Sequence, residues 1–191
     1  MSRRMAGLLA IAVLAIAGIW LLFVALPRWT RKPTAASPAP AAPAAERKIT
    51  ATLYYVADDG MSLVGVQQEV PFGESVVDQA RHILLAQIES PAAPLVSAIP
   101  AGTALRALYV TERGDAFVDL SPEAQTKHTG GALDELFTVY TIVDALTVNL
   151  PAITRVQILI DGKEVDTLSG HVDLRHPLQK NLQWIREKDG S

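Results

Sequence analysis

The chain has 191 residues, 49% of them hydrophobic, with a formal net charge of −3 and a mean hydropathy of +0.22. It has no cysteine, which excludes disulfides, thiolate metal sites and cysteine nucleophiles. From Arg47 onward, 12 basic and 19 acidic residues give a net charge of −7, which disfavours binding to nucleic acid or to anionic lipid surfaces.

A long uncharged segment begins the chain. Met5 to Leu26 contains 22 residues without a charge, and as a helix it would be about 33 Å long, enough to cross a bilayer. The alternative is a cleavable signal peptide, which has a shorter apolar segment followed by a small-residue cleavage site. Residues 19–24, near the end of the apolar segment, are bulky, and no clean small-x-small site precedes Pro27. We therefore expect residues 1–27 to be an uncleaved transmembrane anchor in the lipid bilayer.

The orientation of this anchor follows from the segments around it. Basic residues flank both ends, but a very short N-terminal tail before a long polar domain is typical of a signal anchor that exports the domain. Residues 28–47 contain prolines among alanines, a composition that favours extended conformations and predicts a semi-rigid linker. The expected location is the cell membrane, single-pass, with the folded domain outside the cytoplasm.

Strand and helix signals alternate after the linker. Ser75 and Asp78 form a capping box, Asp161-Gly162 is a hairpin-turn signal, and Gly114 marks another turn. The predicted elements are strands 49–56 and 62–70, a helix between Ser75 and Pro91, strands 105–111 and 116–120, a short helix at 123, a helix over 132–149, and strands 155–160 and 165–168.

This order predicts an α+β fold: a mostly antiparallel sheet with two helices packed on one face, after the N-terminal transmembrane helix. The domain would span residues 48–180, followed by a C-terminal tail over 181–191. Leu136 and Phe137 are expected in the core. Tyr54 and Tyr55 point to opposite faces of a strand, so one is expected to be buried and the other exposed, free to contact a partner or a glycan.

Five segments, in this order, carry a family resemblance: Ile99-Pro100-Ala101-Gly102-Thr103, Val118-Asp119-Leu120-Ser121, residues 141–147 (TIVDALT), residues 156–162 (VQILIDG), and residues 170–174 (GHVDL) with Pro177. Together they resemble the GerMN domain of sporulation and germination proteins, in a single copy over residues 49–178.

This resemblance implies a membrane-anchored or lipid-anchored protein outside the cytoplasm. It implies no catalytic residues. The GerMN domain is similar in fold to ring-building modules of bacterial secretion and sporulation complexes, and this similarity favours an assembly role. The namesake protein has two such domains, whereas only one fits this chain, which weakens the transfer of a specific sporulation role.

Two constellations could carry chemistry. His171, Asp173 and His176 have side chains that suit a divalent metal, but they are more simply a closing loop whose polar groups cap the backbone. Asp119 and Ser121 could form a hydrolytic set, with His128 or His171 as the base.

No nucleophile motif surrounds Ser121, which is more simply a helix cap before Pro122. Asp119 is expected to hydrogen-bond the adjoining turn, and His82 to be solvated or half-buried. We therefore predict no catalytic, cofactor-binding or metal-binding residues and no cofactor.

The predicted function is a non-enzymatic binding or assembly module of the bacterial cell envelope, related to sporulation or germination. Its partner would be an envelope protein or peptidoglycan, or a second copy in a homo-oligomer, and not nucleic acid. The alternatives are a module that binds peptidoglycan or another wall ligand and, least favoured, a wall-acting hydrolase.

Overall fold

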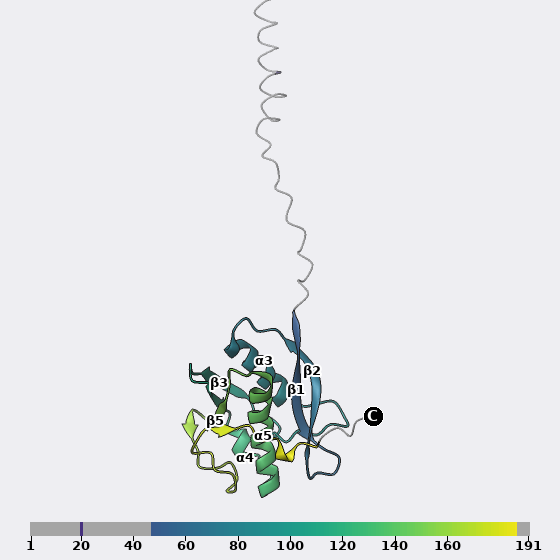
Figure 1. Ribbon diagram of the computed structural model, residues 1–191, viewed down its shortest axis with the longest axis vertical. Coiled ribbons are helices and arrows are strands. Elements are labelled where there is room, and N and C mark those ends of the chain that lie inside the picture. Colours follow the sequence, from purple (N-terminus) through teal and green to yellow (C-terminus); the bar gives the residue numbers. More distant parts are fainter. Residues whose placement is uncertain (1–19, 21–46, 187–191) are drawn as a thin grey trace, which may run out of the picture. The chain divides into compact units, whose positions relative to one another are not determined.

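The computed structural model describes residue 20 and residues 47–186 (Figure 1). The chain divides into two compact units, Met1–Ala44 and Ala45–Ser191, and the second is described here by itself. Among the described residues, no helix combines the length and the apolar character needed to cross a bilayer. The predicted anchor and linker lie outside the described residues, apart from Trp20 and Arg47.

The first sheet is the predicted hairpin. Strands β1 (Lys48–Val56) and β2 (Leu63–Pro71) pair in antiparallel register from Lys48 opposite Pro71 to Val56 opposite Leu63. Strand-forming residues on both sides of an Asp-Asp-Gly turn explain the pairing, because the turn reverses the chain directly into its partner strand.

A second, five-stranded sheet has the order β3-β4-β5-β6, with β7 also paired to β5. Its strands are β3 (Leu105–Val110), β4 (Asp115–Leu120), β5 (Arg155–Ile160), β6 (Lys163–Glu164) and β7 (Leu178–Gln179). Strands β4 and β5 are parallel, because a helix lies between them in the sequence and returns the chain to the same end of the sheet. The predicted α+β class is confirmed, and among the described strands every pairing except β4–β5 is antiparallel, but the strands form two sheets and not the single sheet that had been predicted.

The helices are α3 (Val76–Ile88), α4 (Glu123–Thr126), α5 (Ala132–Asn149) and the 3-10 helix η2 (Leu182–Trp184). Ser75 caps α3 as predicted, since its Oγ accepts from the Asp78 N–H at 3.1 Å; the same hydroxyl donates to the Asp78 carboxylate. Helix α3 contacts β1, β2 and β3, and α5 contacts β1 and β5. The two long helices thus lie between the sheets and not on one face of a single sheet, as had been predicted (Figure 1).

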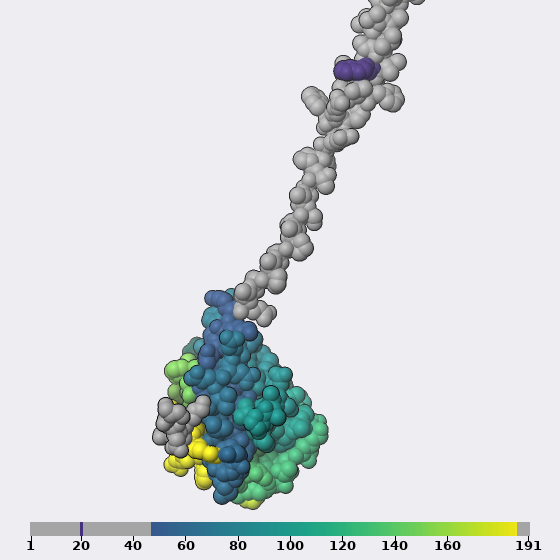
Figure 2. All heavy atoms as spheres, turned by 90° about the vertical axis from the view of Figure 1, so that its right-hand side faces the viewer, coloured from purple at the N-terminus to yellow at the C-terminus, as the bar shows by residue number. Residues whose placement is uncertain are grey.

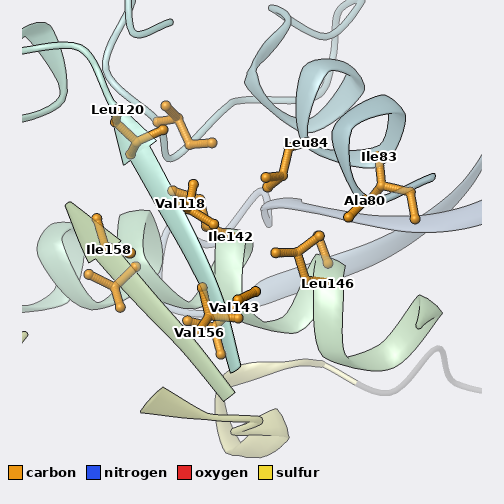
Figure 3. Close-up of a cluster of buried hydrophobic side chains, with 14 of the residues drawn as sticks. Ala80, Ile83, Leu84, Val118, Leu120, Ile142, Val143, Leu146, Val156 and Ile158 are labelled. Atoms are coloured by element: carbon orange, nitrogen blue, oxygen red, sulfur yellow. The ribbon is translucent and has the colours of Figure 1, made fainter. Parts of the chain in front are cut away.

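The hydrophobic core forms where these helices meet the second sheet (Figure 3). Helix α5 contributes Ile142, Val143 and Leu146, all fully buried. Phe137 is buried as predicted, but Leu136 is only half-buried. The other side chains labelled in Figure 3 come from α3, β4 and β5: Ala80, Ile83, Leu84, Val118, Leu120, Val156 and Ile158.

Side-chain amides satisfy the second edge of β1. Asn149 of α5 accepts from the Thr52 N–H and donates to the Thr52 carbonyl, both at 2.8 Å. Gln87 of α3 makes the same pair of bonds to Tyr54, again at 2.8 Å. Two residues further along, the Val56 N–H donates to the Val96 carbonyl. The amides therefore replace a third strand, and the helices that carry them are fixed against β1.

This packing corrects the prediction for the tyrosines. Tyr54 and Tyr55 are 3% and 1% exposed, so neither is free at the surface. Strand alternation predicted one exposed ring, but here elements cover both faces of β1. The exposed tyrosine is Tyr109, on the edge strand β3, at 65% exposure.

The last hairpin is shorter than predicted. Asp161 and Gly162 have φ of 53° and 74°, so both central residues have the positive φ of a type I′ turn, and the predicted turn is confirmed. Strand β6 then ends at Glu164, and the expected strand over 165–168 does not form. The chain leaves the sheet because the N–H groups of Leu168 and Ser169 donate to Glu135 of α5.

We expect residues 47–191 to fold without the N-terminal segment, because their sheets and helices bury one another. In that chain, Phe137→Ala should lower the free energy of unfolding by about 3–5 kcal/mol through loss of buried surface and creation of a cavity. Urea denaturation followed by circular dichroism would measure it. Leu136→Ala is the matched control and should cost clearly less; equal losses would contradict the observed orientation of α5.

Candidate functional site

A cleft of about 690 Å³ lies at the end of β1, between the chain segment 96–102 and the first turns of α5. Its size is within the range typical of ligand-binding sites, roughly 300–1,000 Å³. Residues 99–102 are part of the first segment that resembles the GerMN domain, and residues 127–129 form the other rim. This cleft is the candidate functional site.

A tight turn shapes one wall of the cleft. The Thr103 N–H donates to the Pro100 carbonyl at 3.1 Å, and the Thr103 hydroxyl donates to the same oxygen at 2.7 Å. Gly102 has φ of 86°, as the third residue of a type II turn requires. A Cβ at Gly102 would lie 2.9 Å from Lys127 Nζ, so glycine also makes room for this ammonium group at the rim.

A relay of hydrogen bonds forms the floor of the cleft. His128 Nδ1 accepts from the Gly130 N–H at 3.0 Å, so the other ring nitrogen, Nε2, carries the proton toward Thr138 Oγ1 at 3.1 Å. The Thr138 hydroxyl in turn donates to the Ala98 carbonyl at 2.6 Å. Both His128 nitrogens are thus engaged in joining the cleft wall to α5.

The proposed hydrolytic residues do not come together. The Ser121 hydroxyl accepts from the Ala104 N–H at 3.0 Å, and no side-chain hydrogen bond caps α4, so the predicted helix-cap role was wrong. Asp119 accepts from the Gly162 N–H at 2.7 Å, in the turn on the neighbouring strand, and from Arg106. His128 instead bonds Thr138, so the predicted pairing of Ser121 with His128 does not form, and the Ser121 hydroxyl bonds the Glu123 carboxylate.

The candidate metal ligands His171, Asp173 and His176 do not form a common site. His171 bonds Glu135 through Nδ1 at 3.0 Å, whereas Asp173 pairs with Arg175 at 2.7 Å. Within residues 47–186, no group of three or more histidine and acidic side chains is arranged to hold a metal ion. His82 is half-buried, with Nδ1 3.0 Å from the Pro71 carbonyl.

Glu135 is the important residue that the sequence did not reveal. Its fully buried carboxylate accepts from the N–H groups of Leu168, Ser169 and His171 and from His171 Nδ1, at 2.8–3.0 Å. Burial raises the pKa of Glu135, but these donors outweigh burial and hold the pKa below its usual value. In the sequence, Glu135 is one of two acids in the first turn of a helix, and nothing distinguishes it from Asp134.

These features define an α+β domain with an open cleft and a loop fixed to a buried acid. The chain belongs to the Germane family, described as "Sporulation and spore germination", whose sequence profile matches residues 52–166. This match confirms the GerMN-like assignment suggested by the five sequence segments. A search of curated proteins found no match to the chain.

Solved structures show the same fold. A candidate lipoprotein from Clostridium perfringens is 26% identical, with a TM-score of 0.50, and the match covers 70% of this chain and 88% of that one. The tandem GerMN domains of the sporulation protein GerM from Bacillus subtilis are 20% identical, with a TM-score of 0.51. That match covers 71% of this chain and 46% of the tandem structure.

Glu135→Gln should lower the free energy of unfolding by about 2–4 kcal/mol at pH 7, because the amide NH₂ cannot accept from the two His171 donors. The effect should depend on pH. A lowered folded-state pKa means that the carboxylate stabilises the fold above its unfolded pKa and loses this effect as pH falls through the folded pKa.

The test is urea denaturation of wild type and variant from pH 7 down to the acid limit of folding. The difference in free energy of unfolding between the two proteins should become smaller as the pH falls. Glu164→Gln, at an exposed position on β6, is the control and should have little effect. If this difference stayed constant over the whole pH range, it would contradict the stabilising role assigned to the Glu135 charge.

Proposed function

We propose that this chain is a membrane-anchored, extracytoplasmic binding module of the bacterial cell envelope, which holds a partner in its cleft and catalyses no reaction. The observation that carries the proposal is the open cleft itself, bordered by the family's Ile99–Gly102 segment. The family's description and the lipoprotein among the similar structures support a sporulation-related role at the envelope.

The position of the cleft suits a tethered module. The chain enters the domain at Lys48, the first residue of β1, and the cleft is lined by Val56, the last. A strand of nine residues is about 30 Å long, so the cleft lies far along the domain from the point where the linker attaches. A partner could therefore reach it while the domain remains held to the membrane.

The lining of the cleft suits a protein or peptidoglycan-peptide partner. Val96, at the edge of the cleft, is 58% exposed, and the half-buried Ile88 adds apolar surface. Lys127 and Asp134 add one cation and one carboxylate. Apolar surface with a few convergent polar groups is the usual composition of a binding site.

Self-assembly is a second candidate, favoured by the edge strand β3. Among the strands of the described residues, β3 pairs only with β4, and its Tyr109 is 65% exposed. An open strand edge with an exposed ring can contact a second copy, and anchoring in a membrane would bring copies together at high local concentration.

The topology in this proposal has a direct test. The protein should sediment with membranes and resist carbonate extraction, and a periplasmic-type reporter fused after Ala45 should be active outside the cytoplasm. A soluble product whose N-terminus begins beyond Leu26 would show instead that a signal peptide had been removed.

The cleft is tested by a photo-crosslinking residue placed at Val96 in the full-length protein at native expression. Leu85 on α3 is a matched control, since it is also an exposed apolar residue, at 48% exposure. We expect a specific adduct from position 96 and none from position 85. Adducts from both positions, or from neither, would contradict a binding role for the cleft.

The crosslinking experiment also distinguishes between the possible partners. A hetero-adduct identified by mass spectrometry would indicate an envelope protein, and loss of retention on purified sacculi in Val96→Asp, but not in Leu85→Asp, would indicate peptidoglycan. A ladder of homo-oligomers obtained only from a crosslinker at Tyr109 would favour self-assembly over the cleft.

A further inference from the structure

The last described segment, residues 178–186, forms a strap that joins the two sheets. At one end, Leu178 of β7 pairs with Val156 of β5. At the other, Ile185 forms a parallel bridge with Leu63 of β2. Figure 2 shows this yellow segment beside the blue β1–β2 hairpin. The strap lies beyond residues 52–166, which the family profile matches.

Each end of the strap pairs with a different sheet over a short stretch. The pairing of β7 with β5 involves two residues of β7, and the bridge to β2 involves one. The Arg186 guanidinium pairs with Asp58 at 2.7 Å and Asp59 at 3.0 Å, but these acids are 89% and 47% exposed as side chains. The Arg186 N–H also donates to the Leu63 carbonyl at 2.8 Å. Exposed ion pairs of this kind contribute little to stability.

The middle of the strap covers α5. The rings of Trp184 and Phe137 meet edge to face, with centroids 6.5 Å apart. The Asn181 N–H donates to Asp144 Oδ1 at 3.0 Å. Asp144 is fully buried, and its other oxygen, Oδ2, has no hydrogen-bond partner among the described residues.

The groups around Asp144 do not offset the cost of burying its charge. Lys180 of the strap supplies a favourable interaction, and Tyr54 of β1 faces the carboxylate from the first sheet. Burial raises the pKa of Asp144 to about 6, against smaller lowering effects of the Asn181 N–H and Lys180. Burial, and then the Asp144 charge, raise the pKa of Tyr54 to about 12.

We propose that the strap is a pH-dependent latch: it closes tightly when Asp144 is protonated and loosens when Asp144 is charged. A charged carboxylate with one unpartnered oxygen is costly to bury, and releasing the strap gives it back to water. An open strap would expose the Phe137 ring, the β5 edge at Val156 and the β2 edge at Leu63.

The sign of the effect follows from linkage. The closed state binds the Asp144 proton more tightly than the open state, in which the carboxyl would titrate near its ordinary pKa of 3.8. The opening constant therefore rises with pH between the two pKa values and levels off above about pH 6. From pH 5 to pH 7 the rise is about tenfold for these pKa values.

The test is hydrogen–deuterium exchange with mass spectrometry on the full-length protein in nanodiscs, from pH 4.5 to pH 7.5, with rates corrected for intrinsic exchange. Peptides covering residues 178–186 should gain about tenfold in opening from pH 5 to pH 7, while β4 peptides should not. In Asp144→Asn this dependence should vanish. Asp166→Asn, which changes an exposed acid, is the control and should keep it.

Lys180→Ala provides a second variant at an exposed position, where misfolding is not expected. Losing this cation should raise the folded-state pKa of Asp144 and move the midpoint of the pH dependence upward. A flat profile in the wild-type protein, or a wild-type slope retained in Asp144→Asn, would overturn the proposal. Neither result would bear on binding in the cleft, which the crosslinks at Val96 test separately.

Discussion

The pairing of β1 with side-chain amides is the interaction on which the rest of the structure depends. A strand buried on both faces and paired along only one edge leaves N–H and C=O groups that must find partners. Asn149 and Gln87 supply them to Thr52 and Tyr54, each with a donor and an acceptor in the geometry of a neighbouring strand.

The consequences reach the whole domain. Because these amides belong to α5 and α3, satisfying one strand edge also fixes both helices against the first sheet. Their opposite sides remain available for the second sheet, which explains why the helices lie between the sheets. At the end of β1, where the amide pairs give way to the single bond from Val56 to Val96, the cleft opens.

Two buried acids on α5 show how the surroundings of a carboxylate decide what it does. Glu135 accepts four hydrogen bonds from the segment 168–171. These donors stabilise the charged carboxylate and lower its pKa, so they fix the loop around His171 to α5. Among the described residues Asp144 receives one hydrogen bond, and burial raises its pKa to about 6, so its charged form is disfavoured. Helix α5 therefore carries one acid, Glu135, that fixes the loop at residues 168–171, and a second, Asp144, whose charge would loosen the proposed latch at residues 178–186.

The sequence by itself determined the elements whose signals are local. The hairpin at residues 58–60, the helix cap at Ser75 and the Asp161-Gly162 turn depend on neighbouring residues alone, and each is present as predicted. The five family segments were recognisable for the same reason, since each is a continuous stretch. The membrane anchor is also a local prediction, and it concerns residues outside those described.

Tertiary structure decided everything that required distant residues to meet. Glu135 and His171 lie 36 positions apart, and Thr52 and Asn149 lie 97 apart, so no pattern along the chain reveals their bonds. The split into two sheets, the burial of both tyrosines and the early end of β6 follow from such contacts. The cleft is formed by segments that only the packing of α5 against residues 96–102 brings together, because a binding site is a property of surfaces and not of sequence order.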